Sequence, residues 1–73
     1  PRPGMEEVRY TIFEHARLQL KYKGEYIGIR EMRKHVAWYT KGYPNSARLR
    51  DMVNEMETFG QLEEGINRIF QAR

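Results

Sequence analysis

Basic and aromatic side chains occur together in residues 28–42 of this 73-residue sequence. Ammonium and guanidinium groups bind phosphate and flat rings stack on bases, so the mixture is typical of a surface that binds a base-bearing polyanion. A helix needs few cations to remain in solution, and an external partner would explain the others. The cations are Arg30, Arg33, Lys34 and Lys41, and the rings belong to Trp38 and Tyr39.

On a helix with 100° per residue, four of these side chains fall within one sector of about 80°. The four are Arg30, Lys34, Trp38 and Lys41. Arg33 flanks the sector on the side of the core. We interpret the sector as a phosphate-binding ridge. Trp38 has two possible roles. It could stack on a base or ribose, or it could pack against a neighbouring helix as a structural anchor. A lone Trp in a small helical protein favours the anchor.

The segment that follows Pro44 contains two more cations, Arg48 and Arg50. They stand at the start of an expected helix, where positive charge opposes the helix macrodipole. Such a placement indicates an external use, so both join the predicted nucleic-acid-binding set. The complete set is Arg30, Arg33, Lys34, Lys41, Arg48 and Arg50.

Charge is distributed unevenly along the chain, whose formal net charge is +3. Residues 1–50 contain eleven Lys or Arg and five Glu, a net of +6. Residues 51–73 contain two Arg and five acidic residues, a net of −3. A basic first part and an acidic last part indicate a directed electrostatic surface rather than a general solubility device.

Composition argues against several classes of function. The chain has no Cys, which excludes disulfides and thiol chemistry, and its two His residues lack the further ligands of a metal site. No stretch reaches the roughly twenty apolar residues of a membrane span, and no signal-peptide pattern opens the chain. We therefore expect a cytoplasmic protein without a metal or a membrane partner.

Neither His15 nor His35 stands in a recognisable catalytic setting, because no nucleophile or orienting carboxylate accompanies them at a known spacing. A structural or hydrogen-bonding role is the better interpretation of both. Gly24, Gly28 and Gly42 match no nucleotide-binding fingerprint and are expected in turns and caps.

Apolar residues recur at helical spacing four times, and no useful length alternates with a period of two. The first helix is expected over residues 5–22, and Gly24 ends it. A short turn from Gly24 to Gly28 leads to a second helix, which ends at Lys41-Gly42. The expected buried stripes are Met5, Val8, Ile12, Ala16 and Leu20 in the first helix and Ile29, Met32, Val36 and Tyr39 in the second.

Pro44 blocks the second helix from continuing, and Asn45 or Ser46 is expected to cap a third. Thr58 and Gln61 resemble a capping box that opens a fourth helix. The stripes of these two helices are Leu49, Met52, Val53 and Met56, and Leu62, Ile66, Ile69 and Phe70. The fold class is therefore all-α, a compact four-helix bundle over residues 5–73 preceded by a linker at residues 1–4.

One motif resembles a known family. The motif is Gly24-Glu25-x-x-Gly28 followed by Met32-Arg33-Lys34-His35-x-x-Trp38-Tyr39-x-Lys41-Gly42-x-Pro44. It is similar to the C-terminal helical domain of bacterial tRNA-dihydrouridine synthases, and most similar to the B-type subgroup. His15, Tyr22, Leu49-Arg50 and Glu57-Thr58 also fit the pattern. The resemblance spans nearly the whole chain.

The resemblance implies a parent enzyme that reduces uridine to 5,6-dihydrouridine in tRNA with FMN and NADPH. In the family a TIM-barrel domain holds FMN and supplies a catalytic Cys, and the helical domain follows the barrel and helps to clamp the tRNA. This chain has neither a barrel nor a Cys. It is expected to be non-catalytic, to hold no cofactor, and to have tRNA and the parent's own barrel as partners.

By the same resemblance, Arg33 and Lys34 are the first choices for contact with tRNA, and Lys41 comes next. His35, Trp38 and Tyr39 are expected to fix their helix against its neighbours. Two other functions stay open. The basic ridge suits a protein-interaction module that docks an acidic partner, and residues 42–46 suit the turn of a DNA-binding helix-turn-helix. The helix after that turn shows little base-reading chemistry, so the DNA-binding function ranks last.

Overall fold

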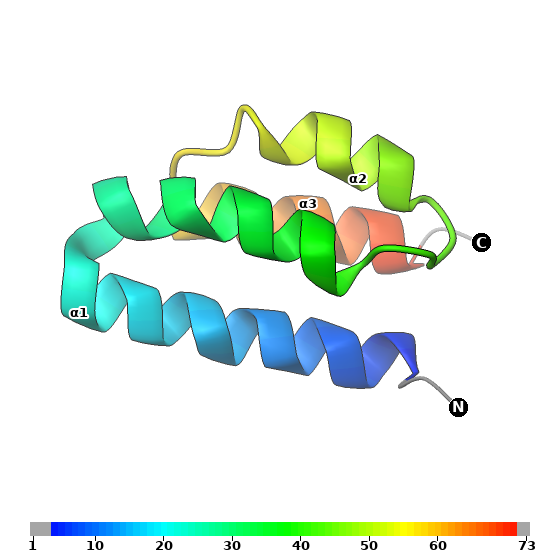
Figure 1. The fold of residues 1–73 in the computed structure, drawn as a ribbon, viewed down its shortest axis with the longest axis horizontal. Coiled ribbons are helices and arrows are strands. Elements are labelled where there is room, and N and C mark those ends of the chain that lie inside the picture. Colours follow the sequence, from blue (N-terminus) through cyan, green and yellow to red (C-terminus); the bar gives the residue numbers. More distant parts are fainter. Residues whose placement is uncertain (1–3, 72–73) are drawn as a thin grey trace.

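The computed structural model describes residues 4–71, and these form three α-helices (Figure 1). Their bounds are α1 (Met5–Tyr39), α2 (Ser46–Val53) and α3 (Phe59–Gln71). The all-α class is confirmed, and no strand occurs within these described residues. The expected count of four helices is not confirmed, because the first two expected helices form the single bent element α1. Residues 1–3 of the expected linker lie outside the described residues.

The bend in α1 occurs at Gly24, whose backbone angles are φ 80° and ψ 165°. Only glycine adopts this region readily, because a Cβ atom would collide with the neighbouring backbone. We call residues 5–23 the first arm and residues 25–39 the second arm. The expected turn from Gly24 to Gly28 is wrong, since one residue suffices to reverse the chain and helical geometry resumes at Glu25.

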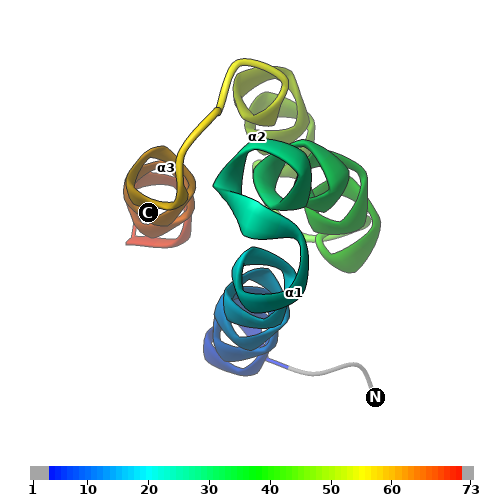
Figure 2. The same cartoon turned by 90° about the vertical axis from the view of Figure 1, so that its left-hand side faces the viewer.

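The two arms run back along each other, and with α2 and α3 they surround a common core (Figures 1 and 2). Gly28 allows the arms to meet closely near the bend. A Cβ atom at Gly28 would lie 3.0 Å from the carbonyl oxygen of Gln19 on the first arm. An ion pair of 2.7 Å between Lys23 and Glu31 spans the bend. The Lys23 ammonium holds the pKa of Glu31 below its usual value, mainly through this hydrogen bond.

The core is built from the expected apolar stripes. Every arm and helix contributes side chains that are almost completely shielded from solvent. This is the arrangement that amphipathic helices require in order to bury one face each. The buried apolar residues are Val8, Ile12, Phe13, Ala16, Ile29, Met32, Val36, Leu49, Val53, Met56, Leu62, Ile66 and Ile69.

The helix starts agree with the sequence signals. Thr58 and Gln61 form the predicted capping box, in which the Gln61 N–H donates to Thr58 Oγ1 (3.1 Å) and the Thr58 N–H donates to Gln61 Oε1 (3.2 Å). Asn45 is the N-cap of α2, although its side chain makes no capping bond. α2 ends at Val53, and Met56 follows it in the core. Gly65 makes room there, because a Cβ atom at this position would overlap the Met56 methyl group.

Replacing Gly24 with Ala should lower the free energy of unfolding by about 1–3 kcal/mol, because Ala is strained at a φ of +80°. Chemical denaturation followed by circular dichroism measures this change. Gly60→Ala is the matched control, since Gly60 lies in the first turn of α3 and a Cβ atom there would meet only Thr58 Oγ1, at an ordinary contact distance of 3.9 Å. The control should leave stability unchanged or raise it slightly. Equal losses in both variants would contradict the role assigned to Gly24.

Candidate nucleic-acid interface

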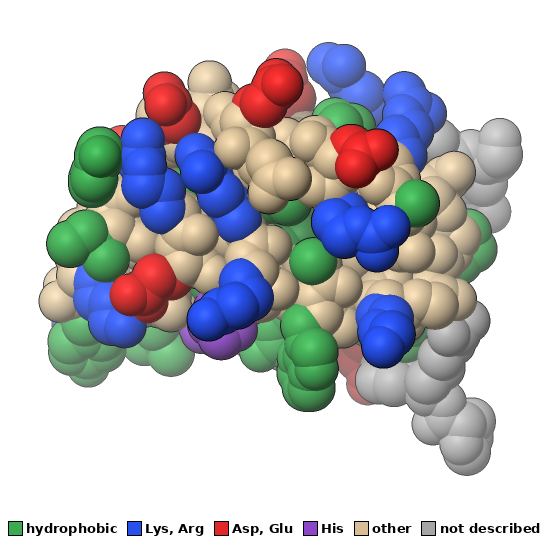
Figure 3. Space-filling model, turned by 45° about the horizontal axis from the view of Figure 1, so that its top comes forward, with side chains coloured by type: hydrophobic (Ala, Val, Ile, Leu, Met, Phe, Trp, Pro, Cys, Tyr) green, Lys and Arg blue, Asp and Glu red, His purple; other side chains and the backbone are tan. Residues whose placement is uncertain are grey.

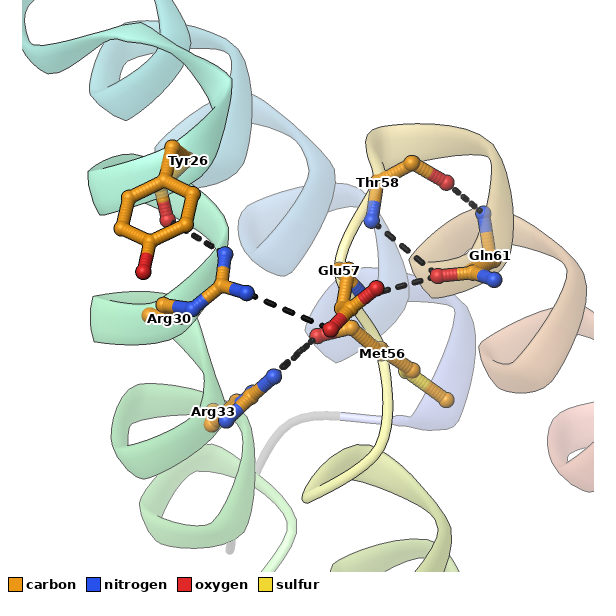
Figure 4. Close-up of polar contacts among 7 residues, drawn as sticks. All are labelled: Tyr26, Arg30, Arg33, Met56, Glu57, Thr58 and Gln61. Carbon is orange, nitrogen blue, oxygen red and sulfur yellow. Dashed lines mark hydrogen bonds and ion pairs between the residues drawn. The ribbon is translucent and has the colours of Figure 1, made fainter.

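Arg30 on the second arm is held by three internal contacts (Figure 4). Its Nη1 donates to the Tyr26 carbonyl oxygen at 3.0 Å, and its guanidinium carbon lies 3.7 Å from the centre of the Tyr26 ring. Its Nη2 forms an ion pair of 3.3 Å with Glu57, in the segment between α2 and α3. The Arg30 side chain is 29% exposed, so it reaches the surface in a fixed orientation.

Arg33 reaches the same segment as Arg30 (Figure 4). Its Nε and Nη2 both donate to the carbonyl oxygen of Met56, at 3.0 Å and 2.8 Å. The hydrogen bonds are partly buried, and a charged donor strengthens them. Arg33 therefore fastens the second arm to the chain that follows α2. Its Nη1 takes no part in this contact.

The segment between α2 and α3 is fixed from two further directions. The Gln61 side-chain oxygen accepts hydrogen bonds from the main-chain N–H groups of Glu57 and Thr58 (Figure 4). From the second arm, Glu25 accepts a hydrogen bond of 2.8 Å from the main-chain N–H of Phe59, at the start of α3. A carboxylate is favourable at this position because the helix macrodipole is positive there. The sequence pattern included Glu25 and Glu57 but did not predict these contacts, because both join residues far apart in the chain.

Lys34 and Lys41 are placed differently from the two arginines. Both are exposed, and neither side chain makes a hydrogen bond or ion pair with another residue of the described range 4–71. Lys34 stands one helical turn before Trp38, and Lys41 follows Thr40, the C-cap of α1. These two ammonium groups are therefore available to an external anion.

Arg48 and Arg50 are exposed on α2. They are two positions apart, which corresponds to 200° around a helix, so they project from different sides of α2. The structure does not bring them into one ridge. Lys and Arg side chains are spread over the face in Figure 3, with acidic side chains between them.

Trp38 is 72% exposed, so its expected role as a structural anchor is wrong. The anchor in this region is its neighbour Tyr39, which is half-buried and whose hydroxyl lies 3.1 Å from Nδ1 of His15 on the first arm. The His15 ring also lies 4.6 Å from the His35 ring, measured between ring centres. These contacts agree with the structural roles expected for His15, His35 and Tyr39, since they join the two arms.

A hollow of about 490 Å³ opens beside Trp38, between the end of α1 and the first arm. Its lining includes Tyr39 and Tyr43 and two charged residues, Lys41 and Glu7. A second hollow, on the outer side of the second arm, contains the side chains of Arg30, Glu31, Lys34 and His35. Within residues 4–71 no three His, Cys, Asp or Glu side chains lie together as metal ligands would. No helix of this range is long and apolar enough to cross a membrane.

Arg33→Met should lower the free energy of unfolding by about 1–2 kcal/mol, because the buried Met56 carbonyl loses a charged donor. Lys34→Met is the matched control at the adjacent position, where the side chain has no internal partner. Its effect should stay within about 0.5 kcal/mol. Urea denaturation of both variants measures the difference. Similar stabilities for the two would show that the Arg33 contact contributes little to folding.

Acidification should destabilise the fold through His35. Burial lowers the pKa of His35 below its usual value, and the nearby His15 and Lys34 lower it further, while Glu31 acts in the opposite direction. The unfolded chain therefore binds a proton more readily, and stability is lost as pH falls below about 6.5 and through the folded pKa. Thermal unfolding between about pH 7.5 and pH 5.5 measures this slope. His35→Gln should reduce the slope, and an unchanged slope would assign it to other groups.

The comparisons with known proteins agree with one another. The family model described as "Dihydrouridine synthase (Dus)" matches residues 1–72. A probable tRNA-dihydrouridine synthase of Mycobacterium leprae is 34% identical over 67 residues, which cover 92% of this chain and 17% of that protein. One of Rickettsia bellii is 41% identical over 56 residues, which cover 77% of this chain and 17% of that protein.

A third relative is the tRNA-dihydrouridine synthase B of Xanthomonas campestris, which is 40% identical over 58 residues, covering 80% of this chain and 18% of that protein. No solved structure matches the chain. The chain spans about a sixth of the length of these curated relatives. Because the family model covers nearly all of its residues, the chain belongs to the dihydrouridine synthase family.

Proposed function

We propose that this chain is the tRNA-binding helical domain of a tRNA-dihydrouridine synthase and that it binds the phosphate backbone through the second arm of α1 and the turn that follows it. The observation that carries the proposal is the exposed pair Lys34 and Lys41. Neither side chain has a partner within the described residues, and Trp38 stands exposed between them. Ammonium groups without an internal partner attract phosphates. Binding then releases the counterions that had condensed on the nucleic acid.

The arginines of the second arm have a supporting role in this proposal. Arg30 and Arg33 hold the arm against the segment between α2 and α3, so the lysines are presented from a rigid surface. Arg33 keeps its Nη1 for a phosphate at the edge of the ridge. Arg48 and Arg50 extend the positive potential over α2, where they increase the rate of encounter with RNA more than they define its position.

The parent protein, in the same proposal, is a cytoplasmic enzyme that reduces uridine in tRNA, with this domain at its C-terminal end. The named activity of the three relatives supports this assignment. FMN and NADPH belong to the remaining part of the parent, a TIM barrel.

A second candidate is a protein-interaction module. Large apolar side chains are exposed on both arms, among them Tyr10, Leu18, Tyr22 and Ile27. Such side chains suit contact with another protein surface. In this version the partner is the parent's own barrel or an acidic protein. A competition experiment separates the two functions. If the chain is a protein-interaction module, duplex DNA or an acidic protein of equal charge should displace tRNA as effectively as unlabelled tRNA does.

The salt dependence of tRNA binding tests the lysine pair. Lys34→Gln combined with Lys41→Gln should reduce the slope of log Kd against log salt concentration by about 1.5, because two phosphate contacts are lost. Fluorescence anisotropy with labelled tRNA measures the slope. The matched control combines Lys21→Gln with Arg68→Gln, which changes the net charge equally outside the predicted set. Equal slopes in both double variants, or no binding of tRNA by the chain, would overturn the proposal.

A further inference from the structure

The hollow beside Trp38 has the walls of a ring-binding site. Three aromatic side chains line it, the exposed Trp38 and the half-buried Tyr39 and Tyr43. Val8 on the first arm adds an apolar surface. A volume of about 490 Å³ lies within the roughly 300–1,000 Å³ of ligand pockets in proteins. Its lining is mostly apolar, so the favoured occupant is a flat, uncharged ring.

The charged residues of the lining restrict the occupant further. Lys41 supplies one positive charge and Glu7 supplies one negative charge, with the Thr11 side chain on the same arm as Glu7. Both charged side chains line the hollow, so a phosphate beside Lys41 is attracted, whereas a phosphate beside the Glu7 carboxylate is repelled. The Glu7 carboxylate can instead accept a hydrogen bond from an N–H group on the edge of a base. This arrangement suits a nucleotide whose base lies inside the hollow and whose phosphate lies beside Lys41.

The hollow lies next to Lys34 and Lys41, the two exposed lysines proposed to bind phosphate. Trp38 lies one helical turn after Lys34, and residues at this spacing are about 5–6 Å apart between Cβ atoms. The main-chain N–H of Lys41 donates to the Trp38 carbonyl oxygen at 3.4 Å, and both side chains line the hollow. A nucleic-acid strand that follows Lys34 and Lys41 therefore passes the mouth of the hollow, where an unpaired base can turn inward.

We propose that this hollow is a stacking site for one unpaired nucleobase of the bound RNA, with Trp38 as the stacking surface and Lys41 as the contact for the adjoining phosphate. The inference rests on the proposed function, which concerns phosphate contacts only. It adds a preference for RNA segments with unpaired bases. A duplex of the same charge satisfies the lysines and leaves the hollow empty.

Trp38 is the single Trp of the chain, so its fluorescence reports on the hollow alone. The chain is titrated with single-stranded RNA, with duplex RNA of the same number of phosphates, and with inorganic polyphosphate. Single-stranded RNA should quench the fluorescence strongly at saturation, because a stacked base contacts the ring directly. Duplex RNA and polyphosphate should bind with little quenching. Equal quenching by all three would overturn the stacking site, and so would an absence of quenching by bound single-stranded RNA.

Substitution supplies the second measurement. Trp38→Leu should weaken the binding of single-stranded RNA by about 5- to 100-fold, and Trp38→Phe should restore part of the affinity. Neither variant should change the salt slope, because no phosphate contact is removed. Tyr22→Leu is the matched control, since Tyr22 is 73% exposed and does not line the hollow. Equal affinities for Trp38→Leu and Tyr22→Leu would refute the stacking site.

The two proposals fail in different ways. A salt slope that Lys34→Gln with Lys41→Gln reduces no more than the control double variant does would refute phosphate binding by the two lysines, whatever Trp38 does. A normal lysine-dependent slope with no effect of Trp38→Leu would refute the stacking site alone. Quenching or a spectral shift with an apolar peptide but not with RNA would assign the hollow to a protein partner, and would also refute the stacking site.

Discussion

The reversal of α1 at Gly24 is the constraint on which the other contacts depend. Because one residue turns the chain, the two arms touch immediately, and Gly28 packs against Gln19. One side of the second arm is then covered by the first arm, and another is tied through Arg33 to the segment after α2. Only the outer side is left for solvent. The exposure of Lys34 on that side therefore follows from packing.

The cations of the second arm divide according to their chemistry. The guanidinium groups of Arg30 and Arg33 present several donors in a plane, and each satisfies internal acceptors from more than one nitrogen. Lys34 and Lys41 carry compact, strongly hydrated charges and remain in water. The basic surface of this small domain thus contains two kinds of cation. Some are bonded within the fold, and others are exposed to solvent and can bind an external anion. Counting cations in the sequence does not separate these two groups.

Local signals predicted the structure well, and long-range contacts escaped prediction. The Thr58 and Gln61 pair is confirmed because both partners of a capping box stand within one turn. The chain reversal was expected at Gly24, but the extent of the turn was not, since it depends on the backbone angles of one residue. The acceptor for Arg33 is a main-chain oxygen 23 residues away, which no side-chain pattern reveals. Trp38 was misjudged because residue type outweighed its position opposite the apolar stripe.

The contact between Arg33 and Met56 has a consequence for how the sequence can vary among relatives. The acceptor belongs to the main chain, so for this contact any amino acid at position 56 provides the same oxygen. A substitution at position 33 removes the contact, whereas a substitution at position 56 affects only the filling of the core. The two ends of one interaction are therefore under unequal selection, and covariation between the two positions would not reveal that they touch.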